Sequence, residues 1–351
     1  MTRRLAALLT LVALTSTSTA LADLPSWLRL APRLPVDRAT PLPPPLRQIA
    51  EDVPDEGTPS PDEHYPVSNE HRHDLFFPHI RDLGGAFIGV GADQCYTLAA
   101  VQHAELVWIV DFDPLVSLVH RMYAVLVPAS EEPRALVARF APESQAATEA
   151  LLRAELASDA GPVVSAFRRN RERMHASLRH SARNVVGGEG ATWMSDPVLY
   201  QRVRALHQGR RIIARNGDLT RDGALRAVAR AATRLRLPVR VLYFSNAEQF
   251  FRYGEELTAS LDALPTDARS VVLRTFRERG APYPPRDRWH YMVQPVDDMR
   301  ARIHENGYRR SRQIVLDLMA SESLGANGAS VVDSRVPRRL DLSREQENDD
   351  E

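Results

Sequence analysis

The stretch AFIGVGADQCYTLAAVQHAELVWIVDFD, residues 86–113, decides the fold of this 351-residue chain. It begins with an apolar run at 86–91, continues with a predicted helix at 96–103, and ends with a second apolar run at 106–111. Short continuous apolar runs indicate strands that are buried on both faces, and an intervening helix makes such strands parallel neighbours. The stretch therefore predicts the first strand–helix–strand unit of an α/β protein.

The same alternation continues through the rest of the chain. The Arg- and Gly-rich segment near residues 160–195 does not fit it and is predicted to be an insertion. The predicted fold class is α/β, with a three-layer, Rossmann-like sheet that is parallel at its centre, formed by residues 67–325. We predict further strands at residues 211–214, 239–245 and 291–293, and further helices at 115–126, 221–235, 247–261 and 297–304.

The first 22 residues have the pattern of a secretory signal peptide. Arg3 and Arg4 precede an apolar run at residues 5–14, and the tripeptide ALA at 20–22 fits a cleavage site. The apolar run is shorter than the roughly 20 residues that span a bilayer. We therefore expect cleavage after residue 22, export to the periplasm or the medium, and no stable membrane insertion of the mature protein.

Two segments outside the predicted domain have compositions that disfavour a packed core. Residues 23–66 are crowded with proline, which removes backbone donors and favours extended conformers. We predict that they form a linker or an arm that wraps the surface. Residues 334–351 begin with arginines and end in acidic residues. This tail is predicted to be disordered and solvated.

The composition excludes several classes of enzyme. All 45 basic residues are arginine, so the chain has no lysine for a P-loop, a protein kinase or a pyridoxal Schiff base. They balance 45 acidic residues, which leaves no overall positive charge to attract nucleic acid or an anionic membrane. We interpret the arginine run at residues 168–173 as a solvated helix face or a contact to the acidic tail. No nucleic acid partner is expected.

Cysteine and histidine give no strong functional signal. Cys95 is the only cysteine, so no intramolecular disulfide can form. A place near the start of a helix can activate a thiol, but a lone cysteine is more often a small buried apolar residue, and we interpret it so. His64, His71, His73 and His79 lie close in sequence without a second ligand motif of matching spacing. We therefore predict surface histidines and no metal site.

The turn after the first predicted strand is the best candidate for a binding site. Gly89 and Gly91 let a ligand approach the backbone, and Asp93 and Gln94 follow before a helix that offers free N–H groups. Asp111 ends the second strand, where an acidic residue can accept both hydroxyls of a ribose. Gln94 stands in place of the third glycine of the dinucleotide-binding pattern. The alternative is that the glycines only permit tight packing of strand and helix.

Three further groups are predicted to reach the same edge of the sheet. Ser245, Asn246 and Glu248 directly follow a predicted strand, Asp218 lies between a strand and a helix, and Glu70 precedes the first core helix. Glu70 and Asn246 are the candidates for catalysis, and the other three are candidates for cofactor binding. The alternatives are helix capping for Asn246 and Asp218, and a solvated loop carboxylate for Glu70.

Five segments in this order resemble an uncharacterised bacterial family with a fold like class I S-adenosylmethionine-dependent methyltransferases. They are SNE (68–70), GVGADQCYTLAA (89–100), WIVDFD (108–113), RNGDLTRDGALRAVAR (215–230) and YFSNAEQFF (243–251). The resemblance covers about residues 65–320, although Cys95 replaces a usual asparagine and Phe112-Asp113 replaces a more basic pair. It implies that one pocket is lined by Gly89, Gly91, Asp93, Gln94, Asp111, Gly217, Asp218, Ser245, Asn246 and Glu248.

Three functions remain open from the sequence. The first is a methyltransferase, in which Asp111 holds the ribose of the cofactor S-adenosylmethionine, Gly89 and Gly91 approach its methionine part, and Glu70 and Asn246 lie near the acceptor. Such a transfer depends mainly on positioning. The second is a noncatalytic binder of a small polar or nucleoside-like ligand, and the third is a hydrolase with a carboxylate base. Export disfavours the first function, because S-adenosylmethionine is made in the cytoplasm.

Overall fold

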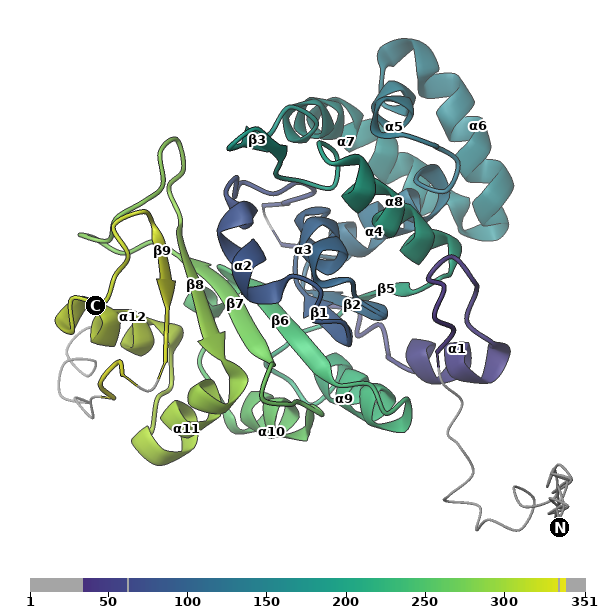
Figure 1. Cartoon of the computed structure of the whole chain (residues 1–351). Coiled ribbons are helices and arrows are strands. Elements are labelled where there is room, and N and C mark those ends of the chain that lie inside the picture. Colours follow the sequence, from purple (N-terminus) through teal and green to yellow (C-terminus); the bar gives the residue numbers. More distant parts are fainter. Residues whose placement is uncertain (1–33, 62, 334, 339–351) are drawn as a thin grey trace, which may run out of the picture. The chain divides into compact units, whose positions relative to one another are not determined.

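The computed structural model describes residues 34–61, 63–333 and 335–338. The predicted signal peptide, the first part of the predicted arm and most of the predicted tail lie outside the described residues. Within the described part, a seven-stranded sheet has helices on both faces (Figure 1).

Seven strands form this sheet in the order β5–β2–β1–β6–β7–β8–β9. The neighbours from β5 to β7 are parallel, β8 runs antiparallel to β7, and β9 runs parallel to β8. The predicted α/β class, with a sheet that is parallel at its centre, is therefore confirmed. The strands are β1 (Ala86–Gly89), β2 (Leu106–Asp111), β5 (Ile212–Asn216), β6 (Val239–Ser245), β7 (Val271–Phe276), β8 (His290–Pro295) and β9 (Ala329–Val331).

The strand order reverses at β1. From β1 the chain proceeds to β2 and then to β5 at the edge, and it returns to β6 on the other side of β1. Gly89 at the end of β1 pairs with Ile109 of β2 and with Tyr243 of β6. In open α/β sheets, ligands bind outside the carboxyl ends of the strands at such a reversal. The fold therefore points to the carboxyl edge of β1, β2, β5 and β6 as the functional region.

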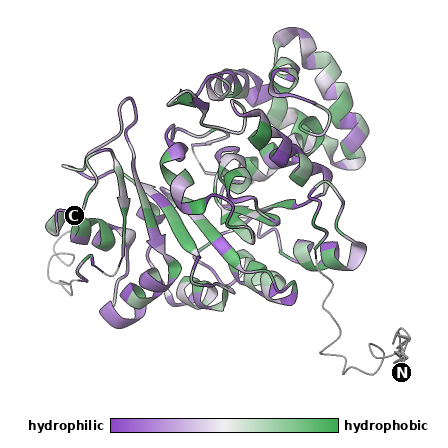
Figure 2. Ribbon diagram, in the orientation of Figure 1, coloured by the Kyte–Doolittle hydropathy of each residue, from purple (hydrophilic) through white to green (hydrophobic). Residues whose placement is uncertain are grey.

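Helices form the two outer layers. Figure 2 shows mostly hydrophobic central strands and helices of mixed hydropathy, as expected when each helix buries one side only. One buried cluster joins the sheet to α2–α8, a second joins it to α1 and α9–α11, and a third lies under α12. The helices are α1 (Pro44–Glu51), α2 (Phe77–Ile80), α3 (Gln94–Gln102), α4 (Pro114–Leu126), α5 (Pro133–Arg139), α6 (Gln145–Leu156), α7 (Ala160–Ser181), α8 (Pro197–Gln208), α9 (Ala224–Arg234), α10 (Glu255–Ala263), α11 (Val296–Asn306) and α12 (Ser311–Ala320).

The apolar runs that decide the fold bury both of their faces. Phe87 and Val107 pack in the cluster with α3, whereas their neighbours Ile88 and Trp108 pack in the cluster with α9. Successive side chains of a strand point to opposite faces, so a run without polar residues requires cover on both. The indole Nε1 of Trp108 also donates to the carbonyl oxygen of Ala50 in α1, at 2.9 Å.

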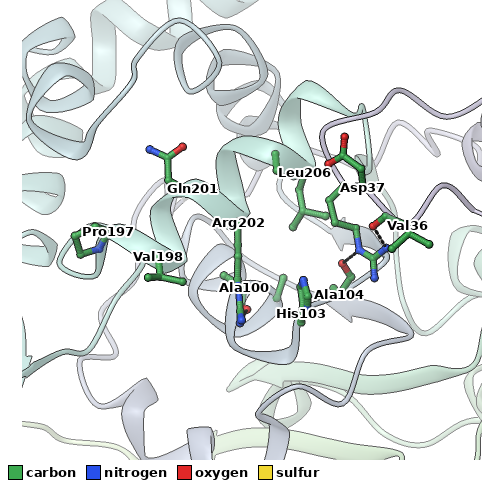
Figure 3. A pocket seen from close by; sticks show the side chains of 13 residues that line it. Val36, Asp37, Ala100, His103, Ala104, Pro197, Val198, Gln201, Arg202 and Leu206 are labelled. Atoms are coloured by element: carbon green, nitrogen blue, oxygen red, sulfur yellow. Dashed lines mark hydrogen bonds between the residues drawn. The ribbon is translucent and has the colours of Figure 1, made fainter.

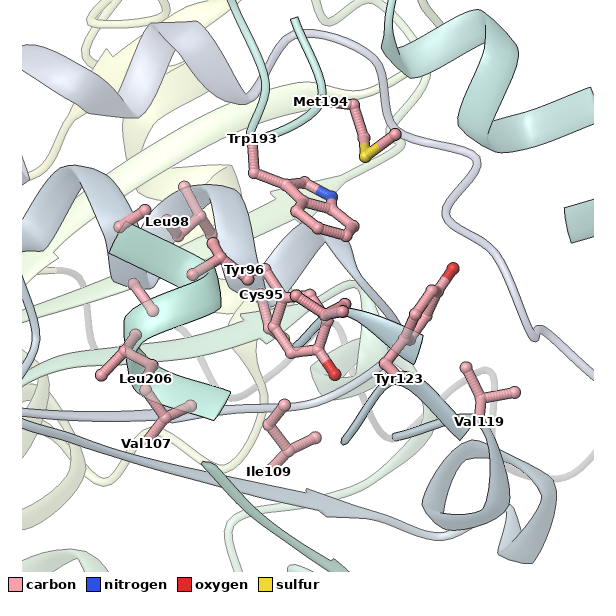
Figure 4. Close-up of a cluster of buried hydrophobic side chains, with 14 of the residues drawn as sticks. Cys95, Tyr96, Leu98, Val107, Ile109, Val119, Tyr123, Trp193, Met194 and Leu206 are labelled. Carbon is pink, nitrogen blue, oxygen red and sulfur yellow. The ribbon is translucent and has the colours of Figure 1, made fainter. Parts of the chain in front are cut away.

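An aromatic cluster supports the glycine turn after β1. Figure 4 shows Tyr96 and Tyr123 around Trp193, with the Tyr96 and Trp193 ring centroids 5.4 Å apart. The hydroxyl of Tyr96 contacts His120 Nδ1 at 2.6 Å, and His120 Nε2 contacts the carbonyl oxygen of Gly91 at 2.9 Å. Burial lowers the pKa of His120 to about 4. The neutral ring therefore accepts from Tyr96 and donates to Gly91, which fixes the turn.

The described part of the proline-rich arm packs against the domain. Leu42, Leu46, Ala50 and Val53 are buried in the cluster that contains α9. Beyond α1 the arm reaches the end of β5, where the amide of Glu56 donates to the carbonyl oxygen of Asn216 at 2.8 Å. The chain then passes the carboxyl edge of the sheet on its way to β1.

Two elements differ from the sequence prediction. The insertion is larger than residues 160–195, because α5, α6, α7 and the hairpin of β3 (Val185–Val186) and β4 (Glu189–Gly190) all lie between α4 and α8. The predicted helix at 247–261 is interrupted, with a 3-10 turn at Ala247–Phe250 and α10 from Glu255. The break coincides with Tyr253. Its ring is buried, and its backbone N–H donates a hydrogen bond to the carbonyl oxygen of Arg309 instead of to a helical neighbour.

The first residues of the predicted tail also pack against the domain. Val336 is buried, and Arg338 pairs with Asp298 and Glu305 of α11 at 3.2 and 3.1 Å. The packed chain therefore extends at least to Arg338.

Candidate functional site

A pocket of about 550 Å³ lies at the carboxyl ends of β2 and β5. It is lined by the arm residues Glu56 and Thr58 and, from the ends of the strands and the segment before α9, by Phe112, Asp218 and Gly223. Phe112 is unusual among the large apolar side chains in being 44% exposed. An exposed aromatic ring beside a carboxylate, in a pocket of this size, has the composition of a small-molecule site.

The arm is held at this pocket because two backbone amides bind the carboxylate of Glu56. The side chain of Glu56 accepts hydrogen bonds from the backbone amides of Asp218, at 2.8 Å, and Ala224 at the start of α9. A Cβ atom on Gly223 would lie 1.9 Å from Glu56 Oε1, so any larger residue there would have to displace the Glu56 carboxylate. Negative charge is favourable at a helix N-terminus. Glu56 therefore fixes the arm as a wall of the pocket.

Asn216 completes the attachment of the arm. Its Oδ1 accepts from the amide of Thr58 at 2.8 Å, and its Nδ2 donates to Thr58 Oγ1 at 2.6 Å and to the carbonyl oxygen of Phe112 at 2.9 Å. Asp218 is satisfied locally, since its Oδ1 accepts from Thr220 and its Oδ2 lies 3.5 Å from Arg221. Asp218 does not cap α9, whose N-cap residue is Gly223; its carboxylate stabilises its own turn instead.

Asp111 lies between this pocket and the glycine turn. Its carboxylate accepts from the amides of Gly91, at 2.7 Å, and Asp113, at 2.9 Å. Burial raises the pKa of Asp111 to about 6, although both amides oppose the shift. Gly91 has φ +86°, which side chains rarely adopt, so the turn needs glycine there. The predicted proximity of Gly91 and Asp111 is thus observed.

Gly89 serves packing rather than ligand access. A Cβ atom there would lie 2.5 Å from Phe87 Cε1 and 2.9 Å from Cys95 Sγ, so β1 and α3 could not approach each other. Cys95 is itself fully buried and donates to the carbonyl oxygen of Val90 at 3.1 Å. Burial raises its pKa well above the usual range, which fits a small apolar residue and not a nucleophile.

Glu70 is the centre of a buried hydrogen-bond network. Its carboxylate accepts from Tyr243, at 2.6 Å, from Thr275, at 2.7 Å, and from Ser245, and it pairs with His73 at 3.0 Å. Burial alone would raise its pKa, but the contacts with His73 and the hydroxyls outweigh burial and lower it. Glu70 is therefore a stable carboxylate and a weak base. The solvated-loop alternative is wrong for this residue, which is 4% exposed.

Sequence reasoning missed the role of His73. The ring is buried at the start of a 3-10 turn (His73–Phe76), and its Nε2 faces both Glu70 and Tyr243. The prediction of surface histidines is wrong at this position. Glu70 lies before this turn, in a segment without helical structure, so no helical spacing in the sequence indicated the contact.

The three candidates after β6 have separate environments. Ser245 adopts φ +52°, a strained backbone for a residue with a side chain, and its hydroxyl donates to Glu70. Asn246 is partly exposed beside it. Glu248, which was expected to bind a cofactor, is instead 2% exposed in an ion pair with Arg274 of β7. A buried carboxylate needs such a partner, so Glu248 belongs to the core.

Asp93 and Gln94 face a second, smaller cavity of about 50 Å³ beneath α7. Asp93 is 6% exposed, and its Oδ2 accepts from the indole Nε1 of Trp193 at 3.0 Å. Burial raises the pKa of Asp93. The side-chain oxygen of Gln94 is buried and has no hydrogen-bond partner among the described residues. An unpaired buried amide oxygen costs about 1–3 kcal/mol relative to one that has a donor.

A third cavity, of about 600 Å³, lies at the other end of α3. Figure 3 shows His103 and Ala104 from that end, Arg202 and Leu206 from α8, and Val36 from the arm. No candidate site residue lines it. Since α3 begins at the carboxyl edge of the sheet, this groove is at the amino edge and outside the functional region.

Two other features concern the described residues only. No group of three or more histidine, cysteine, aspartate or glutamate side chains there is arranged to hold a metal ion. Within the same residues, none of the helices combines the length and the apolar character needed to cross a membrane.

The sequence pattern of the family described as Domain of unknown function (DUF7790) matches residues 65–333. The chain belongs to this family. The DUF7790 match includes all seven strands of the sheet and Glu70, and it begins after the arm residues Glu56 and Thr58. The wall that the arm adds to the larger pocket therefore lies outside the part that defines the family.

Solved structures add a weak likeness. Two structures of the rRNA methyltransferase aviRa from Streptomyces viridochromogenes match at 14% identity with a TM-score of 0.31, over 67% of this chain and 82% of that chain. A likeness of this size carries no argument about function. No protein of curated function matches the chain.

Proposed function

We propose that the pocket at the ends of β2 and β5 binds a nucleoside-type ligand, and that this ligand is S-adenosylmethionine in a methyltransferase reaction. The observation that carries the proposal is the pocket of about 550 Å³ that Phe112 and Asp218 line together with the arm, with Asp111 directly before Phe112 at the end of β2. In this arrangement the base stacks on Phe112, and Asp218 accepts from its exocyclic amine. Asp111 accepts the ribose hydroxyls.

The remaining carboxyl edge supports an acceptor site. The ends of β1 and β6 contribute the Gly91 turn, Ser245 and Asn246, and Glu70 keeps Ser245 in its strained conformation. Methyl transfer requires an in-line approach and little acid–base chemistry. A rigid carboxylate with a lowered pKa suits positioning better than proton abstraction, which disfavours a hydrolase that uses Glu70 as its base.

The localisation and partners expected from the sequence are part of this proposal. The protein would be exported without stable membrane insertion and without a nucleic acid partner, and it would have to obtain its cofactor outside the cytoplasm. A noncatalytic binder would use the same pocket. Turnover of a methyl acceptor separates the two functions.

The experiment is calorimetric titration of the protein with S-adenosylhomocysteine. We expect micromolar binding that Phe112→Ala weakens by about tenfold or more, because a stacked base contributes roughly 1–3 kcal/mol. Asp262→Asn is the matched control, since Asp262 lies on α10 in an exposed pair with His304. Absence of binding to folded protein, or equal affinity for the Phe112→Ala variant, would refute the nucleoside pocket.

A further inference from the structure

The smaller cavity beneath α7 has the features of an independent binding site. It is lined by Asp93, Gln94 and Thr97 of the β1–α3 region, and by Glu70, His73 and His180 from neighbouring segments. None of its lining residues belongs to the pocket that holds Phe112 and Asp218. A volume of about 50 Å³ suits a head group of a few atoms and excludes a whole nucleoside.

Gln94 is the observation that points to a ligand. It is 9% exposed and lines the cavity, and its Oε1 lacks a partner among the described residues. Its Nε2 lies toward the backbone of Gly91, since a Cβ atom there would be 2.3 Å from it. The oxygen is the buried end of this amide, and a hydrogen-bond donor would satisfy it.

The charges around the cavity favour a cation. Asp93 is buried, the one described side chain that donates to its carboxylate is the neutral indole of Trp193, and no arginine lines the cavity. Glu70 contributes a second carboxylate, which is paired with His73. His71 and His180 face each other with ring centroids 5.1 Å apart, and burial lowers the pKa of His71. The walls thus carry acceptors and negative charge, and the described lining contains no permanently charged cation.

We propose that this cavity binds the ammonium head group of a small amine. The carboxylate of Asp93 supplies the countercharge, and Gln94 Oε1 and Thr97 Oγ1 accept the remaining N–H groups. The inference does not depend on the nucleoside proposal, because the two pockets share no lining residue.

Trp193 provides a direct reporter of binding. Its indole N–H donates to Asp93, so its proton–nitrogen NMR signal responds to the charge on that carboxylate. The chain has four tryptophans, and Trp193→Phe assigns the signal. The probe is methylammonium chloride, with sodium chloride at the same ionic strength and methanol as the uncharged molecule of the same size.

We expect a saturable shift of the Trp193 signal with a midpoint on the order of 10 mM for so small a probe. Methylammonium should also lower the pH at which the signal titrates, because a bound cation favours the ionised form of Asp93. In Asp93→Asn, which keeps an acceptor for Trp193, the response should fall at least tenfold. Asp262→Asn should respond like the wild type.

Three outcomes would overturn the inference. One is an equal shift with methanol, which would indicate a neutral polar ligand, and another is no shift at 200 mM methylammonium, on the order of 20 times the expected midpoint. The third is an unchanged response in Asp93→Asn. Titration with S-adenosylhomocysteine on the same samples distinguishes the two sites, since its binding should be insensitive to Asp93→Asn.

Discussion

The two pockets at the carboxyl edge differ in how their polar groups are satisfied. Around the larger pocket, the arm supplies a partner for each polar group that it meets, with Glu56 on the amides before α9 and Thr58 on Asn216. Around the smaller cavity, the Gln94 oxygen has no partner among the described residues, and the one side-chain donor to the Asp93 carboxylate there is the indole N–H of Trp193. The arm therefore builds one pocket, whereas the other is left for a ligand to complete.

This difference predicts a rigid wall around the larger pocket and polar groups free to bind a ligand in the smaller cavity. A fully hydrogen-bonded polar network stabilises a single conformation. A buried polar group without a partner destabilises the fold unless a ligand forms the missing hydrogen bond. The larger pocket accordingly presents a preformed shape with one exposed ring, Phe112. The smaller cavity presents charge and hydrogen-bond acceptors.

The largest effect is expected at Glu70, which lines the smaller cavity. Replacement by alanine leaves the donors of Tyr243, Thr275 and His73 buried without their acceptor. We expect Glu70→Ala to lower the free energy of unfolding by about 3–5 kcal/mol in urea denaturation, and Glu70→Gln to lose less. A loss below 1 kcal/mol would show that the network is not a structural centre.

We expect that a methyl group added at Gly223 detaches the arm from the segment before α9. Because a Cβ atom on Gly223 collides with Glu56, Gly223→Ala should displace the arm and cost about 2 kcal/mol of stability. Hydrogen exchange of the Thr58 amide, which is bonded to Asn216, should become markedly faster. Glu56→Ala removes the same hydrogen bonds, so adding Gly223→Ala to it should make exchange no faster, and this pair of variants is the control. Slow exchange in Gly223→Ala would contradict this attachment of the arm.

Affinity of the larger pocket should depend on pH through Asp111. Its pKa is raised to about 6, and only the carboxylate accepts both ribose hydroxyls. Binding of S-adenosylhomocysteine should therefore be full above pH 7 and weaken by about tenfold for each pH unit well below 6. Calorimetry from pH 5 to 8 tests this expectation. In Asp111→Asn the affinity should be low and nearly independent of pH.

The smallest effect is expected at Gln94. Because its oxygen is unpaired, Gln94→Leu should leave the free energy of unfolding unchanged or raise it by up to about 1 kcal/mol. The matched variant Asn216→Leu should lower it by about 2–3 kcal/mol, since that amide is fully bonded. Thermal and urea unfolding of both variants measure the contrast. Equal losses would remove the distinction between the two pockets.

The sequence predicted the layers of the fold because β1 and β2 are uninterrupted apolar runs. It did not reveal β7, where Arg274 breaks the apolar pattern and is neutralised by Glu248 from another element. For the same reason it assigned Glu248 to the pocket that contains Asp218, which Glu248 does not line. A buried ion pair between distant positions leaves no local periodicity to detect.

The candidate site was predictable where two strands that are close in the sequence determine the geometry. The turn at Gly91 and its approach to Asp111 follow from neighbouring parallel strands. The surroundings of Glu70 come from β6 and β7, and the larger pocket needs a glycine that accommodates Glu56 from the arm. These depend on long-range packing, which spacing along the chain does not encode.

The most direct test of the central claim locates the ligand on the protein. Nuclear Overhauser contacts between the adenine protons of S-adenosylhomocysteine and assigned side chains would identify the pocket that holds the base. If the adenine lies in the larger pocket, its protons should contact the Phe112 ring and Thr58. Contacts to the groove of Val198 and Leu206 instead, or none to Phe112 at saturation, would contradict it.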